Sequence, residues 1–349
     1  MSHPSLLPAL LALGSLALVS CADDTTQPNS VAEQPAKPEL ALTINAWRTR
    51  RDMPFEASKV ATAMVRDAAG QSILYVIGGA GPPWGFGVDR VQAYNVATNT
   101  WSQKARLPYP LYESNGAGVI DGKIYFSGGL YEDEEEWGPF ASLFVYEPAT
   151  DRWTQKKSMP ESGATGVTGV IGGQLYVVST CYEEVPWEDE YDTCSGVEGG
   201  RPGVSNFFRY SPVADRWVRL PSPKGEYHMG AVLDRKVYVT DGRKFEVYDP
   251  GTNRWTTRIS EGQVRQRAAV TEQGFRLYLI GGRGRWTGTA WRIFRTTKVY
   301  DPATNTWTTA APLPTGRFDI TASKIFLNGQ PRIEVVGGSP PGNNLQYLP

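Results

Sequence analysis

Short apolar runs recur along the chain, and each run ends in small or turn-forming residues. Four runs end in a double glycine and two carry a degraded copy of it; they cover residues 73–79, 123–129, 276–282 and 332–338, and 174–180 and 236–242. A further apolar segment precedes each run, and in three cases Asp121-Gly122, Gly172-Gly173 or Asn328-Gly329 separates the two. Such pairs accept positive φ at little cost and favour two-residue hairpins. The pattern therefore predicts pairs of antiparallel strands.

A second pattern, a Tyr and a Trp that are separated by six residues, follows five of the six runs. It occurs at Tyr94 and Trp101, Tyr146 and Trp153, Tyr210 and Trp217, Tyr248 and Trp255, and Tyr300 and Trp307. The residues between them are rich in Pro, Asn and Asp, which set up tight turns. Each repeat therefore reads as two hairpins, that is, four short antiparallel strands.

The spacing of the repeats indicates one architecture. The Trp residues of successive repeats, from Trp47 to Trp307, are 38 to 64 positions apart, close to the period of about 50 residues that is typical of kelch repeats. A double glycine after a buried strand, followed by Tyr and then Trp, resembles the kelch family over about residues 40–349. The resemblance implies an all-β fold, a kelch-type β-propeller with its blades around a central channel.

The two ends of the chain indicate how many blades there are. Trp47 has no run before it, whereas the last run, 332–338, has no Trp after it. We therefore expect residues 40–47 to lie beside residues 344–348 as the outer strand of the last blade. This gives a six-bladed propeller over residues 40–349 whose last blade is closed by an N-terminal strand.

Composition agrees with this fold and excludes one class of partner. The chain of 349 residues has 37 Gly, 26 Pro, 11 Trp and 17 Tyr, as expected for short strands and turns. A length of 349 residues would suggest two domains, but a propeller is one closed unit. The formal net charge of -1 gives no argument for nucleic acid as a partner, and we expect a monomer.

The first 20 residues are typical of an export signal rather than of the fold. Residues 6–19 are apolar but too short for a convincing membrane span. They lead into Leu18-Val19-Ser20-Cys21, which resembles the bacterial lipobox and implies lipidation of Cys21. The segment before them lacks Lys and Arg, which is a departure from the usual signal, and an ordinary signal peptide with an incidental Cys21 is the alternative.

Residues 21–39 should form a flexible tether, because they contain three prolines and few bulky apolar side chains. Ala22 and Asp23 are compatible with what resembles an outer-membrane sorting signal. We therefore expect an outer-membrane lipoprotein of the bacterial cell envelope, on its periplasmic or its surface face, anchored to the membrane through lipid.

Two further cysteines, Cys181 and Cys194, lie in the longest insertion, between the second and third strands of the third repeat. In an exported protein they predict a disulfide, which by loop-closure entropy would contribute about 3 kcal/mol. A pair of zinc ligands is the alternative, although that insertion contains no His.

Catalytic signals are scarce. His3 and His228 are the two histidines, so a single-chain copper-radical oxidase of the galactose oxidase type, also a kelch propeller, is excluded because it needs more than one His ligand. No nucleophile elbow, P-loop, zinc-protease or dinucleotide fingerprint occurs. We expect no cofactor, no metal and no assigned catalytic residue.

The candidate site is the face of the propeller on which two sets of loops emerge, here named the mouth face. One set joins each outer strand to the next blade, and the other joins the second and third strands of a blade. The candidate binding residues in these loops are Glu113, Asn115, Trp84, Trp187, His228, Arg243, Arg267, Arg283, Arg285, Trp286 and Arg317. Aromatic and charged side chains should therefore converge there.

Charge is unevenly spread over these loops. Blades two and three carry acidic runs at 132–136 and 183–190, whereas blade five carries several arginines. The acidic runs are either solvated loops, a calcium site or a surface for a basic partner. Exposed Arg and Trp are typical of binding hot spots, although single Trp residues also pack under their own loops.

Two functions fit these features. The first is a membrane-tethered, non-catalytic binding module that engages an unknown protein or carbohydrate through the mouth face. The second is a sugar-acid mutarotase, because the chain also resembles the periplasmic sialic acid mutarotases, which are six-bladed kelch propellers. Glu113, Glu161, His228, Arg267 and Arg317 would then supply acid-base chemistry and a carboxylate clamp. Fold alone decides neither function.

Overall fold

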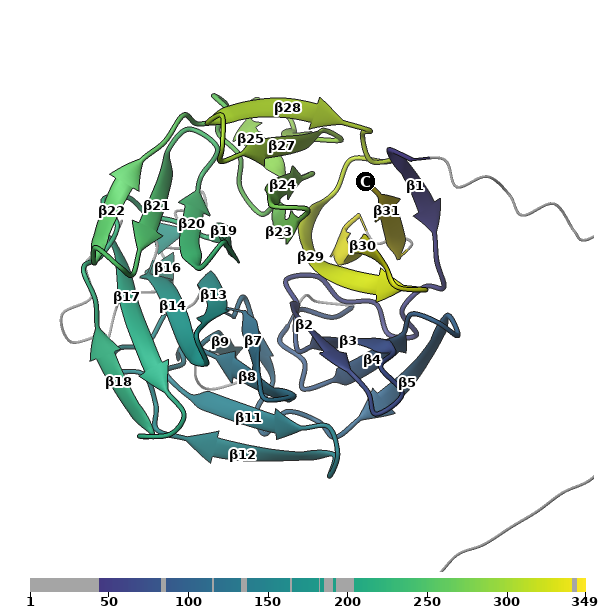
Figure 1. Ribbon diagram of the computed structural model, residues 1–349, viewed down its shortest axis with the longest axis vertical. Helices are drawn as coiled ribbons and strands as arrows, with labels where there is room; N and C mark the ends of the chain where they lie inside the picture. Colours follow the sequence, from purple (N-terminus) through teal and green to yellow (C-terminus); the bar gives the residue numbers. More distant parts are fainter. Residues whose placement is uncertain are drawn as a thin grey trace, which may run out of the picture. The chain divides into compact units, whose positions relative to one another are not determined.

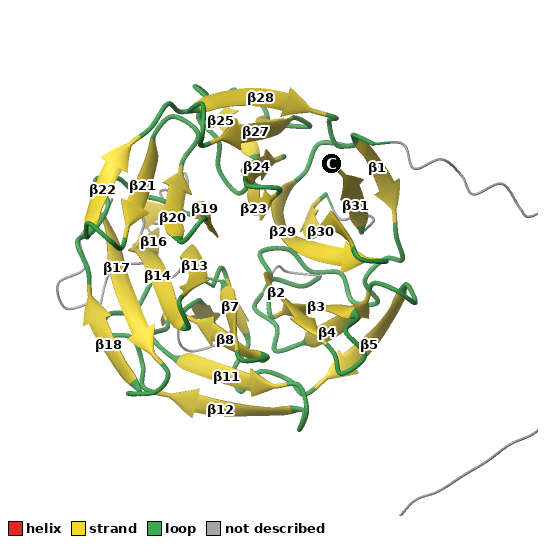
Figure 2. Ribbon diagram, in the orientation of Figure 1, coloured by secondary structure: helices red, strands yellow, loops and turns green. Residues whose placement is uncertain are grey.

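The computed structural model describes residues 44–82, 86–114, 116–132, 137–163, 165–181, 183–184, 191–192, 204–340 and 344–349. The predicted signal peptide, the tether and Cys21 lie outside these residues, as do Trp84, Asn115, Trp187 and Cys194. Every regular element in the described residues is a β-strand, as Figure 2 shows. No helix among them is long and apolar enough to cross a bilayer. The all-β prediction is confirmed for this part of the chain.

The strands form six four-stranded antiparallel sheets within the described residues. We number the sheets 1 to 6 in chain order and give their strands from the inside outward. Sheet 1 is β2 (Ala61–Arg66), β3 (Ser72–Ile77), β4 (Val91–Asn95) and β5 (Thr100–Lys104). Sheet 2 is β7 (Ala117–Ile120), β8 (Lys123–Ser127), β11 (Leu143–Glu147) and β12 (Arg152–Lys156). Sheet 3 is β13 (Thr165–Ile171), β14 (Gln174–Cys181), β17 (Val204–Ser211) and β18 (Arg216–Arg219).

The other three sheets follow the same order. Sheet 4 is β19 (Met229–Leu233), β20 (Lys236–Thr240), β21 (Phe245–Asp249) and β22 (Arg254–Thr257). Sheet 5 is β23 (Ala269–Gln273), β24 (Arg276–Ile280), β27 (Thr297–Asp301) and β28 (Thr306–Ala310). Sheet 6 is β29 (Phe318–Leu327), β30 (Gln330–Ser339), β31 (Leu345–Leu348) and β1 (Ala46–Thr49), so its outer strand comes from the other end of the chain.

Smaller sheets lie in the loops between second and third strands, and one of them also takes in β6, from the loop between β5 and β7. They are β6 (Leu111–Tyr112) with β9 (Leu130–Glu132) and β10 (Trp137–Pro139), β15 (Glu183–Glu184) with β16 (Tyr191–Asp192), and β25 (Arg283–Trp286) with β26 (Trp291–Ile293). Cys181 ends β14, so it lies at the start of the predicted insertion.

The six sheets surround a central opening, with their first strands innermost (Figure 1). Each first strand contacts the first strands of the two neighbouring sheets, and β2 contacts both β7 and β29. The turn residues predicted between first and second strands adopt the expected conformation: φ is 49° at Asp121 and 73° at Gly122. Local turn chemistry thus sets the hairpins that place one short strand of each sheet at the centre.

A repeated set of hydrogen bonds fastens each sheet to the next. In sheet 1, the Tyr94 hydroxyl donates to Asn99 Oδ1 at 2.7 Å, and Asn99 Oδ1 also accepts the amide of Arg51 at 2.9 Å. The Trp101 indole N–H donates to the Arg51 carbonyl at 2.9 Å. Asn99 has φ 56°, a left-handed conformation that Asn tolerates well. Thus the Tyr and Trp of a repeat, together with an Asx five positions after the Tyr, bind their sheet to the segment that follows the outer strand of the preceding sheet.

Sheet 6 has the same motif, although its parts come from both ends of the chain. Trp47 of β1 pairs with Tyr347 of β31, and their rings lie 5.0 Å apart between centroids. The Trp47 indole donates to the Ala311 carbonyl at 2.9 Å, as the other repeat tryptophans do to their neighbouring sheets. We predicted this strand at 40–47, of which residues 40–43 lie outside the described residues; β1 runs from Ala46 to Thr49, opposite Leu348 to Leu345 of β31.

Tyrosines also pack between neighbouring sheets. Five pairs have ring centroids 5.5 to 6.4 Å apart: Tyr75 with Tyr146, Tyr125 with Tyr210, Tyr176 with Tyr248, Tyr238 with Tyr300, and Tyr278 with Tyr347. At the sixth junction, between sheets 6 and 1, Glu334 stands where the other repeats have the first Tyr of the pair. Its carboxyl is fully buried and accepts from Gln346 Nε2 at 3.0 Å. Burial raises the pKa of Glu334 to about 8.

Candidate functional site

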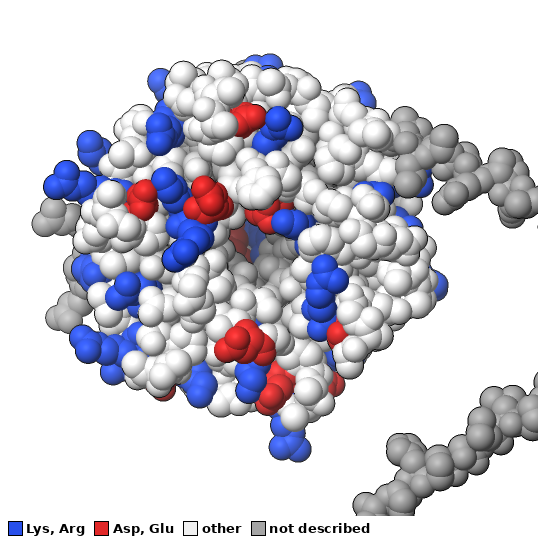
Figure 3. All heavy atoms as spheres, viewed as in Figure 1, with Lys and Arg blue, Asp and Glu red and all other residues white. Residues whose placement is uncertain are grey.

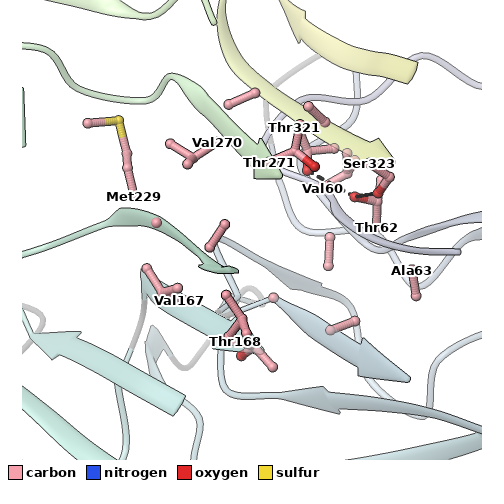
Figure 4. A pocket seen from close by; sticks show the side chains of 18 of the residues that line it. Val60, Thr62, Ala63, Val167, Thr168, Met229, Val270, Thr271, Thr321 and Ser323 are labelled. Carbon is pink, nitrogen blue, oxygen red and sulfur yellow. Dashed lines mark hydrogen bonds between the residues drawn. The ribbon is translucent and has the colours of Figure 1, made fainter. Parts of the chain in front are cut away.

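A cavity of about 380 Å³ runs between the six first strands (Figure 4). Its wall is made of small, apolar and hydroxyl-bearing side chains, and the hydroxyls are linked on one side. Thr62 Oγ1 lies 3.0 Å from Thr321 Oγ1, and the Ser323 hydroxyl donates to Thr62 Oγ1 at 2.9 Å. At the wall, Glu272 and Lys324 form an ion pair of 2.6 Å. The channel wall therefore offers mostly small neutral groups to a ligand, together with this ion pair.

Charged residues from four sheets meet at the mouth-face end of the channel. Arg267 Nη1 lies 2.8 Å from Glu113 Oε1 and 2.9 Å from Asp319 Oδ1. Lys59 Nζ pairs with the same oxygen of Glu113. We name Lys59, Glu113, Arg267 and Asp319 the rim network. The Glu113 carboxylate is buried, so its charge is balanced by two cations rather than by water.

The backbone explains why these four side chains meet. Lys59, Glu113 and Arg267 lie in the loops that lead into first strands, and Asp319 lies at the start of one; each has a positive φ, between 49° and 56°. Their backbones are linked in turn: the Asp319 amide donates to Arg267 O at 2.9 Å, Lys59 to Asp319 O at 3.1 Å and Glu113 to Lys59 O at 3.3 Å. Such a conformation is uncommon for residues other than Gly, Asn and Asp. Here it lets four neighbouring sheets hydrogen-bond around the opening.

Glu113 and Arg267, both predicted site residues, therefore belong to one network. Lys59 and Asp319 complete it and were missed in the sequence. The signal that could have found them is positional, because each lies close to the start of the first strand of its sheet, as Glu113 and Arg267 do. Figure 3 shows that the molecule is hollowed at its centre, with acidic and basic side chains around the hollow.

His228 and Arg317 have different settings. His228 lines the cavity, and its Nε2 lies 3.4 Å from Glu226 Oε1. Arg317 is buried, with 3% of its surface exposed, and burial lowers its pKa while nearby Asp52 raises it. Glu161, which we expected to contribute acid-base chemistry, is ion-paired with Arg219. The five residues expected for a catalytic set are thus not gathered as free groups around one pocket.

The β25–β26 hairpin is the other prominent feature of the mouth face. Residues 285–293 are exposed throughout. The rings of Trp286 and Trp291 lie 5.5 Å apart in an edge-to-face arrangement, and the Arg283 guanidinium lies 4.0 Å from the centre of the Trp291 ring. The predicted residues Arg283, Arg285 and Trp286 are therefore brought together. Trp291 was missed because its contacts depend on hairpin pairing, in which it faces Trp286.

Arg243, also predicted, is exposed in the short loop between β20 and β21, where its amide donates to Asp241 Oδ1 at 2.8 Å. The remaining candidates, Trp84, Asn115 and Trp187, lie outside the described residues, as does most of the acidic run 132–136. In the part of the chain that is described, no group of three or more His, Cys, Asp or Glu is arranged to hold a metal ion.

The fold and the opening define a class: a repeat protein whose four-stranded sheets stand around a channel and carry loops on one face. The kelch motif matches residues 114–160 and 265–314. The chain is 31% identical over 287 residues to the kelch-like protein terF of Aspergillus terreus, covering 76% of this chain and 58% of that protein. It is 25% identical over 277 residues to human kelch-like protein 23, covering 76% of this chain and 43% of that protein.

The chain thus spans about half the length of these curated relatives. The solved structure of YjhT superimposes with a TM-score of 0.63 at 15% identity, covering 85% of this chain and 95% of that one, a likeness that concerns the fold. These matches show that kelch motifs lie at residues 114–160 and 265–314, within the part of the chain whose repeats resemble the kelch family.

Proposed function

We propose that the protein is a non-catalytic binding module, a closed six-bladed kelch propeller that engages a protein or carbohydrate through its mouth face. The pairing of β1 with β31 and the contacts among all six first strands support the closed ring. A ring of sheets that leaves only short, protected edges is a rigid scaffold on which loops can vary. The scaffold would hold the loops at fixed positions and so lower the entropic cost of binding.

One contrast carries this proposal. The charged groups best suited to chemistry, Glu113 and Arg267, bind each other at 2.8 Å in the rim network. By contrast, Trp286 and Trp291 are 41% and 38% exposed on the same face. Exposed Trp together with Arg is the combination that dominates binding hot spots. The mouth face is therefore better equipped for contact than for catalysis.

A sugar-acid mutarotase is the rival function, supported by the cavity at the mouth and by His228 in its wall. The deciding experiment follows the exchange of anomers of N-acetylneuraminate by NMR, starting from one pure anomer. We expect the protein to leave the exchange at the buffer rate. An acceleration that disappears in Glu113→Gln or Arg267→Gln would replace the binding module with a mutarotase.

For the parts of the chain outside the described residues, we propose a lipoprotein of the bacterial cell envelope. The lipobox-like residues 18–21 support an acyl anchor at Cys21, and the proline-containing residues 21–39 support a tether. A disulfide between Cys181 and Cys194 suits the same oxidising compartment. Peptide mapping without reduction would identify that disulfide, and free thiols at both positions in freshly exported protein would contradict it.

A further inference from the structure

The β25–β26 hairpin combines three properties that no other described loop combines: apolar exposure, positive charge and a fixed shape. Nine large hydrophobic side chains are exposed among the described residues, and three of them, Trp286, Trp291 and Ile293, lie on this hairpin. Exposed apolar side chains that gather on one element mark interaction surfaces, whereas isolated ones need no explanation. This clustering is the first argument for a docking surface.

The charge of the hairpin is one-sided. Residues 283–296 contain four arginines and no Asp or Glu. Within the described chain, Arg285, Arg292 and Arg295 make no ion pair with a carboxylate, although Arg295 Nε donates to the Leu313 carbonyl at 2.9 Å. The whole chain has a formal net charge of -1, so this positive region is local. It would attract a partner that is itself acidic over a short length.

The hairpin is held in shape before any partner binds. Arg283 and Gln266 exchange two backbone hydrogen bonds of 2.8 Å, and the Phe294 amide donates to Gly282 O at 2.8 Å. At the tip, the Thr287 hydroxyl donates to the Ala290 carbonyl at 2.8 Å. Because the two Trp rings already contact each other, little side-chain freedom is lost on binding.

These contacts also narrow the kind of partner. Arg283 covers one face of the Trp291 ring, and Trp286 meets Trp291 edge to face. The two Trp rings are therefore a poor open platform for stacking a base or a sugar ring. Binding of nucleic acid is driven by neutralising many phosphates, and four arginines on a protein of net charge -1 provide few. A peptide can instead place an apolar side chain against the Trp pair and carboxylates beside the flanking arginines.

We infer that the β25–β26 hairpin is the docking surface for an acidic peptide segment that also carries apolar side chains. This inference rests on the proposed binding function and names its partner chemistry. Trp286, Trp291 and Ile293 provide the apolar contact, and Arg285 and Arg292 pair with carboxylates.

The test uses a fluorescein-labelled synthetic peptide of ten residues in which Glu and Leu alternate, with fluorescence anisotropy as the readout. The protein is the exported chain without its lipid anchor. We expect saturable binding that weakens as salt rises, because exposed charges are screened. Trp291→Ala and the double variant Arg285→Glu with Arg292→Glu should each weaken binding about tenfold or more.

Matched controls separate a local effect from a general one. Phe275→Ala removes an aromatic side chain that is 80% exposed at the turn between β23 and β24, away from the mouth-face loops. Arg152→Glu with Arg254→Glu reverses two exposed charges on outer strands. Both controls should bind the peptide as the unaltered chain does, and a peptide with Lys in place of Glu should not bind.

Each other outcome decides against the inference in a distinct way. Equal binding of the Glu-Leu peptide to the hairpin variants and the controls would place the docking surface elsewhere and leave the binding module standing. Absence of peptide binding together with binding to anionic phospholipid vesicles or to single-stranded DNA would replace the peptide with that partner. The anomer-exchange experiment separately judges the binding module itself, because it does not depend on the hairpin.

Discussion

The hydroxyl of Tyr347 donates to Asn45 Oδ1 at 2.7 Å, joining residues that are 302 positions apart in the sequence. Asn45 Oδ1 also accepts the amide of Ala311 at 2.7 Å. Asn45 therefore accepts the same two hydrogen bonds in sheet 6 that Asn99 accepts in sheet 1. Unlike Asn99, it lies before its Tyr in the sequence. The first described residues are thus a working part of the last sheet.

This relationship predicts an unequal effect of two similar substitutions. Asn45→Gly should lower the free energy of unfolding by about 2 kcal/mol, because it removes two hydrogen bonds. Asn253→Gly should cost about half as much, since Asn253 accepts from Tyr248 at 2.7 Å while Pro221, at the position matching Ala311, has no N–H to donate. Both positions have φ near 55°, which suits Gly. Urea unfolding measures both values, and equal costs would contradict the model.

Deleting residues 44–49 should be far more harmful than either substitution, because it opens the edge of β31. Deleting residues 22–38 should leave the melting temperature unchanged. Equal melting temperatures for the two truncations would show that β1 contributes nothing to the last sheet.

The rim network predicts a large loss of stability when its buried carboxylate, Glu113, is neutralised. Glu113→Gln should lower stability by about 2 to 3 kcal/mol, because Lys59 and Arg267 then lose the buried carboxylate between them. Glu147→Gln is the matched control: its pair with Lys123 is 3.0 Å long but about 40% exposed, so it should cost less than about 1 kcal/mol. Thermal unfolding compares the two. Similar small losses of stability for both variants would mean that water screens the charges of the rim network.

Glu334 predicts a dependence of stability on pH. Its folded pKa of about 8 lies above the ordinary value of 4.5, mainly because of burial, so the folded protein holds this proton more tightly than the unfolded chain does. The stability it contributes is full below about pH 4.5 and is lost as the pH rises toward 8. Glu334→Gln keeps the shape without the titration. We expect the free energy of unfolding of Glu334→Gln, relative to that of the unaltered protein, to rise from pH 5 to pH 8. A difference between the two proteins that stays constant with pH would contradict this prediction.

Gly230 of β19 predicts a steric limit next to the channel. A Cβ there would lie 2.1 Å from the Tyr238 carbonyl oxygen and 3.0 Å from Val167 of the neighbouring sheet. Gly230→Ala should therefore shift the backbone and cost about 1 to 3 kcal/mol. Gly138→Ala meets no atom within 4 Å and should be almost neutral. Differential scanning calorimetry of the two variants checks the difference, which should be several degrees in melting temperature.

Lipidation of Cys21 is a prediction that lies outside the described residues. The mature protein should fractionate with membranes and be released by detergent, because two or more acyl chains anchor far more tightly than one. Cys21→Ser should leave the protein soluble or unprocessed. Intact mass spectrometry that finds an unmodified Cys21 in a membrane-free pool would exclude the anchor.

The repeated unit could be derived from the sequence because its signals are local. Asp121 and Gly122 form the turn that their residue types favour, and the Tyr, Asx and Trp of the first five repeats lie within eight residues of one another. The unpaired Trp47 pointed to a strand from the start of the chain beside Tyr347 because each of the five other repeat Trp residues had a Tyr before it. What the sequence by itself determined was therefore the β-repeat and the side of each repeat on which the loops lie.

The tertiary structure decided which of the loop residues act together. Glu113 and Arg267 are 154 positions apart and form an ion pair because they face each other across the end of the channel, a relation that no local pattern contains. Lys59 and Asp319 join them through backbone hydrogen bonds between sheets. In the same way, a hairpin pairing brings Trp291 against Trp286 and Arg283 while leaving Trp291 exposed. Short-range turn and packing preferences specify each sheet, but the distances between sheets arise only when all of them pack around one axis.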